Sequence, residues 1–423
     1  MKPKLLTTLQ DYTPRLFASD ALAGVTVALV ALPLSIAIAI ASGADPRAGL
    51  VTAIVGGFLI SLLGGSKVQI GGPTGAFIVV VYGIIAEFGF DGLLLATLMA
   101  GIILVIGGLV RAGRFIALVP EAVIEGFTVG IALIIAVSQL KDLFGLNYGP
   151  ASADLIEAVP AMWSARATFN PAAFAIGLSS IVGIAVLRRL APWFPGSLLV
   201  IAAASAAVAM LALPVDTINS RFGALPGGLP MPSIPHVSIE RISDLLPSAF
   251  VIAFLAGVES LLSAIVADRM IGGSHRSNAE LLAQGAANIA SPLFGGLPAT
   301  GAIARTATNV RAGGKTPVAG IVHALSILLF TISAASLTAY LAMPALAGLL
   351  IVTAWMMSEP NRWRERLSLR KSDRALLFLT MFLTVASDLT VAIGVGTGIG
   401  LAMRLIRRDV EPAEWTPSDR SKL

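Results

Sequence analysis

Long apolar runs, separated by short polar turns, dominate the chain from residue 19 onward. Fourteen apolar segments can be delimited: 19–41, 47–65, 74–87, 91–111, 120–140, 170–187, 194–213, 245–270, 279–294, 301–312, 316–338, 340–357, 373–388 and 389–406. A helix of about 20 apolar residues crosses a bilayer, and a helix that breaks at mid-membrane needs fewer. The pattern predicts an all-α polytopic membrane protein with 14 transmembrane segments. Segments 74–87 and 301–312, the third and tenth, are too short to cross alone and are expected to be half-helices.

Two of the breaks between segments resemble each other. The first reads Gly71-Gly72-Pro73-Thr74-Gly75-Ala76-Phe77, and the second reads Gly295-Gly296-Leu297-Pro298-Ala299-Thr300-Gly301-Ala302-Ile303. Thr74 and Thr300 lie 226 positions apart, and the same offset places Pro33 of the first segment against Glu259 of the eighth. Because seven segments per half is an odd number, the two halves would have opposite orientations. The spacing therefore predicts a 7+7 inverted repeat, the architecture of many transporters.

These breaks are candidate anion-binding positions. Gly and Pro interrupt the helical hydrogen bonds and free backbone groups at mid-membrane, which is tolerated only beside a cavity or inside protein. The helices that restart at Thr74 and Thr300 each present an N-terminus with a partial positive charge. Two such ends and one Arg would bind an anion without a metal. The alternative is a pair of unrelated packing kinks, which the matched spacing disfavours.

Two ionisable residues lie within apolar segments near these breaks. Glu259 is at the middle of its segment, where an ionised carboxylate is costly unless it is paired or hydrated. It predicts a cation or proton site, to which Ser263, one turn further on the same face, would add a hydroxyl. Arg305 lies one turn into the helix that starts near Thr300 and would face the anion. The alternatives are a structural carboxylate for Glu259 and, for Arg305, a structural ion pair with Glu259.

The composition agrees with a membrane protein and excludes several other classes. Of 423 residues, 56% are hydrophobic and 13% are charged, whereas soluble domains carry about 25% charged residues. The absence of Cys excludes a disulfide framework and Cys-ligated metals. His236, His275 and His323 are far apart, and His323 is expected to be a hydrogen-bonded core residue. With no nucleophile–base pair or metal cluster, the sequence does not predict an enzyme.

The positive charges predict the topology and account for the net charge of +5. If the N-terminus is cytoplasmic, 23 Lys and Arg residues lie inside and five outside, and Arg305 falls within a segment. This asymmetry follows the positive-inside rule and explains the positive charge without a nucleic-acid partner. The N-terminus (1–18) lacks a signal-peptide pattern, and the tail (407–423) is too short for a folded domain. We therefore expect a multi-pass protein of the cell (inner) membrane with both termini in the cytoplasm.

The run from Asn278 to Gly320 carries a family resemblance. It contains Glu280-Leu281, Gly285, Ala287-Asn288, Phe294-Gly295-Gly296, Pro298, Thr300-Gly301, Arg305-Thr306, Asn309, Ala312-Gly313 and Thr316-Pro317-Val318-Ala319-Gly320. This run resembles the sulfate permease (SulP) family of anion transporters. Gly71 to Phe77 and Ala23 to Ala39 resemble that family's third and first spans. The resemblance covers all 14 segments and implies a core domain at 19–111 and 245–338 and a gate domain at 120–213 and 340–406.

The resemblance also implies a binding site and a mode of transport. The anion would bind between the two helix ends and move with an elevator-like motion of the core. The binding positions would be Thr74, Ala76, Phe77, Ala302, Ile303, Ala304 and Arg305. Arg305 matches the family's site arginine. Glu259 and Ser263 match the acid and hydroxyl that hold Na⁺ in a sodium-dependent bicarbonate branch of the family. Thr300 and Gly301 lie near the same cation position.

Two departures from the family pattern matter. Members often carry Gln or Glu after the first-span proline, where this chain has Leu34. A polar substrate contact is therefore missing, which leaves the identity of the anion open. The family usually ends in a regulatory domain of the STAS type, whereas this sequence stops just after its last segment. We expect the membrane domain only, without a C-terminal STAS domain.

These features together predict a secondary active transporter of a small anion coupled to Na⁺ or H⁺. Moving an anion inward against the membrane potential costs about 2.3 kcal/mol per charge per 100 mV, which a co-transported cation offsets. Bicarbonate is favoured over sulfate or a dicarboxylate, and the oxygens of Ser263 and Thr300 favour Na⁺ slightly. A bound Na⁺ is the only cofactor considered, and a homodimer in the lipid bilayer is expected. The alternatives are an uncoupled anion channel or exchanger on the same fold, and a nucleobase permease.

Overall fold

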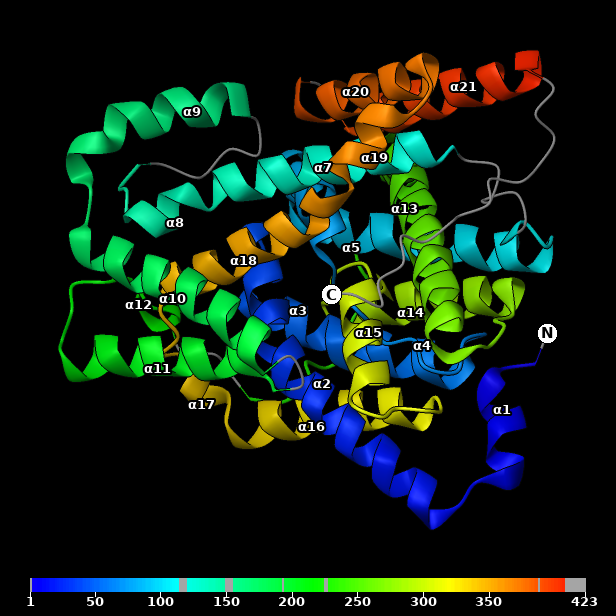
Figure 1. The fold of residues 1–423 in the computed structure, drawn as a ribbon, viewed down its shortest axis with the longest axis horizontal. Helices are drawn as coiled ribbons and strands as arrows, with labels where there is room; N and C mark the ends of the chain where they lie inside the picture. The colour runs from blue at the N-terminus through cyan, green and yellow to red at the C-terminus, as the bar shows by residue number, and fades with distance from the viewer. Residues whose placement is uncertain are drawn as a thin grey trace.

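A computed structural model describes residues 2–113, 120–148, 155–191, 194–223, 227–386 and 389–407 (Figure 1). From residue 408 on, the predicted tail lies outside the described residues. The first half of the chain forms α1 (Lys4–Thr8), η1 (Leu9–Asp11), α2 (Pro14–Ala41), α3 (Pro46–Val51), η2 (Thr52–Gly56), α4 (Gly57–Leu63), β1 (Gly71–Gly72), η3 (Gly75–Phe77), α5 (Ile78–Leu109), α7 (Glu121–Ser138), α8 (Leu140–Phe144), α9 (Leu155–Ser164), η4 (Ala165–Thr168), α10 (Pro171–Leu190), α11 (Gly196–Met210) and α12 (Ile218–Phe222).

The second half repeats the helical pattern. It forms α13 (Ile239–Ile271), α14 (Ser277–Leu293), β2 (Thr300–Gly301), α15 (Ile303–Arg311), α16 (Val318–Ser333), α17 (Ala335–Thr338), α18 (Met343–Met357), η5 (Pro360–Arg362), α19 (Trp363–Ser368), α20 (Lys371–Ala386) and α21 (Leu389–Arg407).

Each of the 14 predicted segments has a helical counterpart, which confirms the predicted fold class. Within the described residues, seven helices are long and apolar enough to cross a membrane, and three shorter apolar helices accompany them. The tenth segment is the short α15, as predicted. The third and fourth segments join into α5, which is interrupted at Gly89, whose φ is 72°. The second segment consists of α3, a π-helical stretch (η2) and α4.

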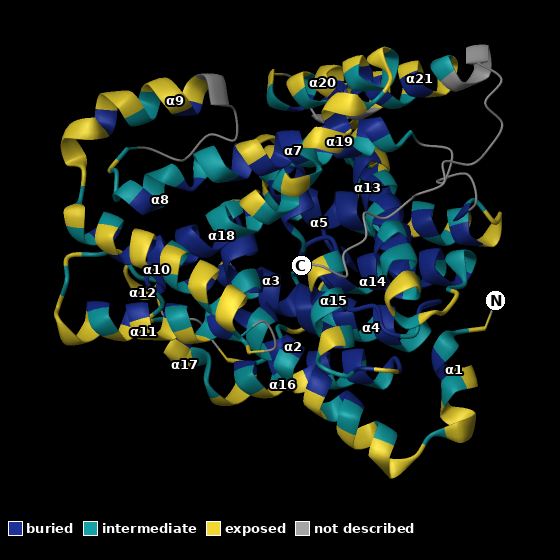
Figure 2. Ribbon diagram, in the orientation of Figure 1, coloured by how far each residue is buried: buried dark blue, intermediate teal, exposed yellow. Residues whose placement is uncertain are grey.

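The helices make their most extensive contacts within two groups, although α2 also packs against α11 and α18. α5 packs mainly against α13 and α14, and α16 packs against α2. In the other group, α7 packs against α20 and α18, and α10 packs against α18 and α11. In Figure 1, α10, α11 and α12 lie on the left, and α13, α14 and α15 lie on the right. Buried residues are concentrated where the helices meet at the centre (Figure 2). The assignment of these groups as separately moving domains stays a prediction.

The two sequence-related breaks meet in the middle of the structure. β1 pairs with β2 in antiparallel fashion, with Gly71 opposite Gly301 and Gly72 opposite Thr300. The backbone N–H of Ala302 also donates to the carbonyl of Ile70 at 2.8 Å. The breaks are therefore not unrelated kinks. They hydrogen-bond to each other across the two halves of the chain.

A buried carboxylate at the start of α2 also joins the two halves. Asp20 is fully buried and accepts hydrogen bonds from the N–H groups of Lys315 and Thr316, at 2.7 and 3.1 Å. It also accepts from the Thr316 hydroxyl at 2.6 Å and from the Tyr12 hydroxyl at 3.0 Å. Burial, followed by the charge of Asp20, raises the pKa of Tyr12 to about 12. The Tyr12 hydroxyl therefore stays protonated and keeps donating at neutral pH.

Candidate functional site

The pairing of β1 with β2 brings two helix N-termini to the same place. Thr74 is the extended residue before η3, which runs directly into α5, and Ala302 is the N-cap of α15. The first N–H groups of a helix have no acceptor within the helix and carry a partial positive charge. The side chains of Ala76, Phe77 and Ala302 are buried around these ends. Ile303 is half-buried and Ala304 is exposed. These two residues contribute their backbone N–H groups to the N-terminus of α15.

Arg305 adds a full positive charge beside these helix ends. Its side chain is only 2% exposed, and its Nη2 donates to the hydroxyl of Ser35 on α2 at 3.1 Å. Its Nη1 has no hydrogen-bond partner among the described residues. A Cβ atom at Gly72 would overlap this nitrogen, and Gly72 has a φ of 149°, which side chains rarely tolerate. Gly72 therefore leaves the space that the guanidinium occupies.

Glu259 lies near the first of the helix ends. Its Oε2 accepts a hydrogen bond from the Thr74 hydroxyl at 2.8 Å, and both side chains are half-buried. Within the described part of the chain, Glu259 and Arg305 form no ion pair. The interpretation of Arg305 as the structural partner of Glu259 is therefore wrong. The Glu259 carboxylate, bound to Thr74, and the Arg305 guanidinium, bound to Ser35, therefore lie separately near the paired helix ends.

Two further hydroxyl groups of α13 contact β2 and α15. The hydroxyl of Ser260 contacts that of Thr300 at 2.7 Å and accepts from the N–H of Gly301 at 3.0 Å. The hydroxyl of Ser263 contacts that of Thr306 at 3.3 Å. The hydrogen bonds of the described residues do not join Ser263 to Glu259. Ser263 lies one turn from Glu259 along α13, and the assignment of these two residues as a Na⁺ site stays a prediction.

Three residues of this site were not identified from the sequence. Ser260 fixes β2, Ser35 holds Arg305, and Gln69 donates from its Nε2 to the carbonyl of Ser260 at 3.1 Å. The spacing of three between Ser260 and Ser263 was an available signal, because such residues share one helix face. Ser35 offered no signal, because its contact with Arg305 spans 270 positions.

His323 is buried on α16, but not as predicted. Neither ring nitrogen has a hydrogen-bond partner among the described residues. The expectation of a hydrogen-bonded core histidine is therefore wrong. An ideal Cβ atom at Gly57 would lie 4.0 Å from Cδ2 of His323 and 3.0 Å from the carbonyl oxygen of Gly71 in β1. The ring of His323 and the β1 backbone therefore both lie close to Gly57.

A cavity of about 320 Å³ lies between the two helix groups and reaches the start of α5. Ile40, Tyr82 and Ile85 line it from α2 and α5, and Ile134 and Ser138 line it from α7. Ile78, which follows Phe77 directly, is also part of the wall. Charged residues occur towards α8 and α12, where Arg221 binds Asp142 at 2.7 Å. Among the described residues, its lining includes neither Thr74 nor Glu259 nor Arg305.

The chemistry of this arrangement suits an anion bound without a transition metal. Two helix N-termini and a guanidinium all attract negative charge, and the described residues contain no cluster of three or more His, Cys, Asp or Glu side chains. The single carboxylate with a neighbouring hydroxyl, Glu259 with Thr74, offers oxygen ligands of the type that alkali cations prefer.

Comparison with known proteins gives one family. The model of the sulfate permease family matches residues 17–380. YvdB of Bacillus subtilis, named provisionally as a sulfate transporter, is 42% identical over 406 residues, which cover 96% of this chain and 76% of YvdB. The bicarbonate transporter BicA of Picosynechococcus sp. is 30% identical over 400 residues, 92% of this chain and 70% of BicA.

A solved structure agrees with the sequence comparison. The transmembrane domain of a cyanobacterial bicarbonate transporter BicA aligns with a TM-score of 0.79 and 27% identity. The alignment covers 93% of this chain and 98% of that domain. The range that the family model matches, residues 17–380, includes both breaks.

Proposed function

Because the chain belongs to the sulfate permease family, we propose that it is a secondary active transporter of a small anion, with bicarbonate as the favoured substrate. The family and its matched members are multi-pass membrane transporters and not enzymes. Anion transport is therefore the activity of the family. What we propose for this chain is the identity of the substrate and of the driving ion.

One observation carries the proposal. Nη1 of Arg305 is buried without a partner, next to two helix N-termini that hydrogen-bond to each other through β1 and β2. A buried guanidinium N–H left without an acceptor costs free energy, of the order of 1–3 kcal/mol. A bound anion would satisfy it. This observation supports an anion site and argues against a neutral nucleobase ring as the ligand.

Bicarbonate fits this site for two reasons. It is a small anion, and Glu259 and Ser263 match the acid and hydroxyl of the sodium-dependent bicarbonate branch of the family. BicA, which is named as a bicarbonate transporter, is similar over 92% of the length of this chain. YvdB carries sulfate in its provisional name, so sulfate is the second substrate to test.

The coupling ion would act at Glu259. Its carboxylate is half-buried and already receives the Thr74 hydroxyl, so a Na⁺ or a proton there would bind beside the backbone that holds the anion. A cation at this position lowers the electrostatic cost of carrying the anion across the membrane. We propose that core helices carry both ions together past the gate helices in an elevator motion.

Uptake into proteoliposomes tests the proposal. Purified protein would be offered labelled bicarbonate, sulfate and fumarate under an inward Na⁺ gradient, an inward proton gradient, or neither. We expect bicarbonate uptake above that of empty vesicles, accelerated by one of the two gradients. Glu259→Gln should lose the acceleration by that gradient, because the amide binds neither a proton nor Na⁺ as strongly.

Other outcomes would replace parts of this proposal. Uptake that is equally fast with and without gradients would identify an uncoupled channel or exchanger. An unchanged gradient dependence in Glu259→Gln would remove Glu259 from the coupling role. Uptake of uracil but of no anion would contradict the proposal as a whole.

A further inference from the structure

The helix α18 ends beside the candidate anion site. It has 15 residues, which make about 22 Å of helix, less than the roughly 30 Å of a hydrocarbon layer. Its last residue, Met357, lies against Gly75, the first residue of η3. An ideal Cβ atom at Gly75 would be 3.0 Å from Sδ of Met357 and 3.6 Å from Cδ1 of Ile135 on α7. Two apolar side chains from the predicted gate thus cover the backbone next to Thr74.

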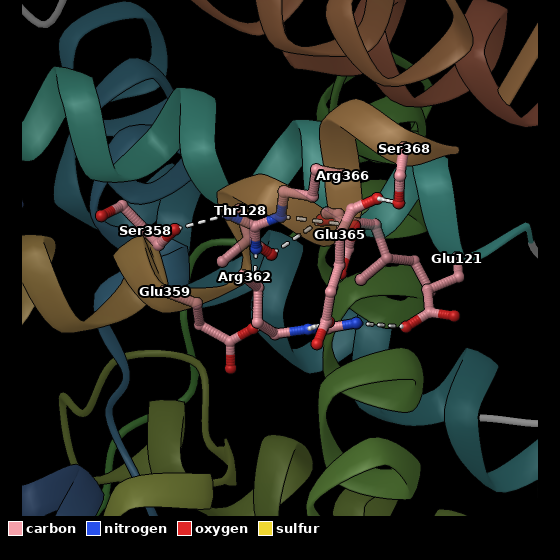
Figure 3. A network of polar contacts seen from close by, with 10 residues as sticks. Glu121, Thr128, Ser358, Glu359, Arg362, Glu365, Arg366 and Ser368 are labelled. Atoms are coloured by element: carbon pink, nitrogen blue, oxygen red, sulfur yellow. Dashed lines mark hydrogen bonds and ion pairs between the residues drawn. The ribbon is translucent and has the colours of Figure 1, made fainter. Parts of the chain in front are cut away.

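The chain that follows Met357 is anchored to α7 by ion pairs. Arg362 binds Glu121 at 3.1 Å and Glu125 at 2.7 Å, and both acids are on α7. Arg366 reaches Glu125 at 3.4 Å and donates to the carbonyl of Ser358, the residue after Met357, at 2.6 Å. Figure 3 shows Arg366 reaching back to Ser358 and Arg362 reaching Glu121.

The turn between α18 and η5 is bent sharply at one residue. Glu359 has a φ of 43° and lies in the left-handed region, which is unfavourable for a residue with a side chain. Its carboxylate accepts from Arg362 at 3.1 Å and lies 3.5 Å from Arg366. The same two arginines that bind α7 therefore also hold this turn. The ion pairs thus connect the end of α18, which holds Met357, to α7, which holds Ile135.

We propose that Met357 and Ile135 form an apolar lid over Gly75 that sets the largest anion the site accepts. The inference rests on the proposed anion transport and adds the residues that determine its size selectivity. Arg362 and Arg366 are positioning residues, because they fix where α18 ends and do not touch Gly75.

The chemistry of the two lid residues fits this role. Neither side chain can donate a hydrogen bond, so they limit space without competing with Arg305 for the anion. Methionine has a flexible thioether that fills irregular gaps, and the branched Ile135 gives a rigid wall opposite. Shortening Met357 would open room beside the backbone N–H groups of the α5 end, where an anion larger than bicarbonate could extend.

Competition among anions of increasing size tests the lid. Inhibition of labelled bicarbonate uptake by formate, sulfate, fumarate and succinate would be measured for wild type, Met357→Ala, Met357→Leu and Ile135→Ala. We expect Met357→Ala and Ile135→Ala each to raise inhibition by the dicarboxylates, relative to formate, by about tenfold, the effect of a few carbon atoms in a selective pocket. Met357→Leu keeps the volume and should behave like wild type.

Met356→Ala is the matched control, because the neighbouring methionine contacts Arg188 on α10 and not Gly75. Arg366→Gln should shift the selectivity in the same direction as Met357→Ala. The ratio of inhibition by dicarboxylates to inhibition by formate separates this effect from a general loss of folded protein. Such a loss would lower the uptake rate without changing the ratio. The same ratio in Met357→Ala, Ile135→Ala and wild type would overturn the lid. Wild-type protein that takes up no anion would overturn the proposed function itself.

Discussion

The position of the Arg305 guanidinium depends on the absence of a side chain at Gly72. The guanidinium occupies the volume in which a side chain at Gly72 would lie, and its Nη1 is the buried atom without a partner. Thr74, Glu259 and Arg305 could be identified from the sequence, because polar residues are conspicuous in apolar segments. Ser35 could not, because serine is common in such segments and only its tertiary contact with Arg305 distinguishes it.

Gly72→Ala tests the space that Arg305 needs. The added Cβ would displace Nη1 and strain the backbone at a φ of 149°. A charge-assisted hydrogen bond is worth about 1.5–3 kcal/mol, so we expect anion affinity to fall at least about tenfold. The half-saturation concentration for bicarbonate uptake measures this change. Gly83→Ala is the control, because no atom lies within 4 Å of a Cβ there, and wild-type affinity in Gly72→Ala would argue against the packing described.

At the scale of elements, the breaks and half-helices follow from the sequence, whereas local irregularities do not. Gly and Pro mark where the helices stop, and the 226-residue offset predicts that the two breaks are related. The π-helical stretch at Thr52–Gly56 was not predicted. The hydroxyl of Thr52 accepts from the N–H of Leu297 at 2.7 Å, a contact over 245 positions that no local pattern reveals.

Asp20→Ala tests the link between the start of α2 and the turn before α16. Removal of the carboxylate leaves the N–H groups of Lys315 and Thr316 without their acceptor. Because a buried unsatisfied group costs about 1–3 kcal/mol, we expect a loss of about 3 kcal/mol. Tyr12→Phe removes one hydrogen bond and should cost only about 1 kcal/mol. Thermal unfolding in detergent measures both, and equal midpoints for the two variants would contradict the assigned role of Asp20.

At the scale of the whole molecule, the helices form two groups with a cavity of about 320 Å³ between them. The division of the chain into a core and a gate comes from the family resemblance and stays a prediction. Because the chain has no Cys, any introduced pair of cysteines is the only thiol pair present.

Cross-linking across this cavity tests the elevator motion. Ile85→Cys on α5 with Ser138→Cys on α7 would place one thiol in each group, both on the cavity wall. We expect a bifunctional thiol reagent to stop transport, because it ties the core to the gate. Ala41→Cys with Ala86→Cys is the matched control, since both residues line the same cavity within the predicted core. Equal inhibition of both pairs would contradict a moving core.

The central claim is that Arg305, between the two paired helix ends, binds the transported anion. Bicarbonate and sulfate uptake into proteoliposomes by wild type, Arg305→Lys and Arg305→Ala, at equal amounts of folded protein, tests it most directly. We predict uptake of at least one anion by wild type, a loss of about tenfold or more in Arg305→Ala, and partial activity in Arg305→Lys, which keeps the charge without the planar fork. Uptake by Arg305→Ala at the wild-type rate and affinity would contradict the claim.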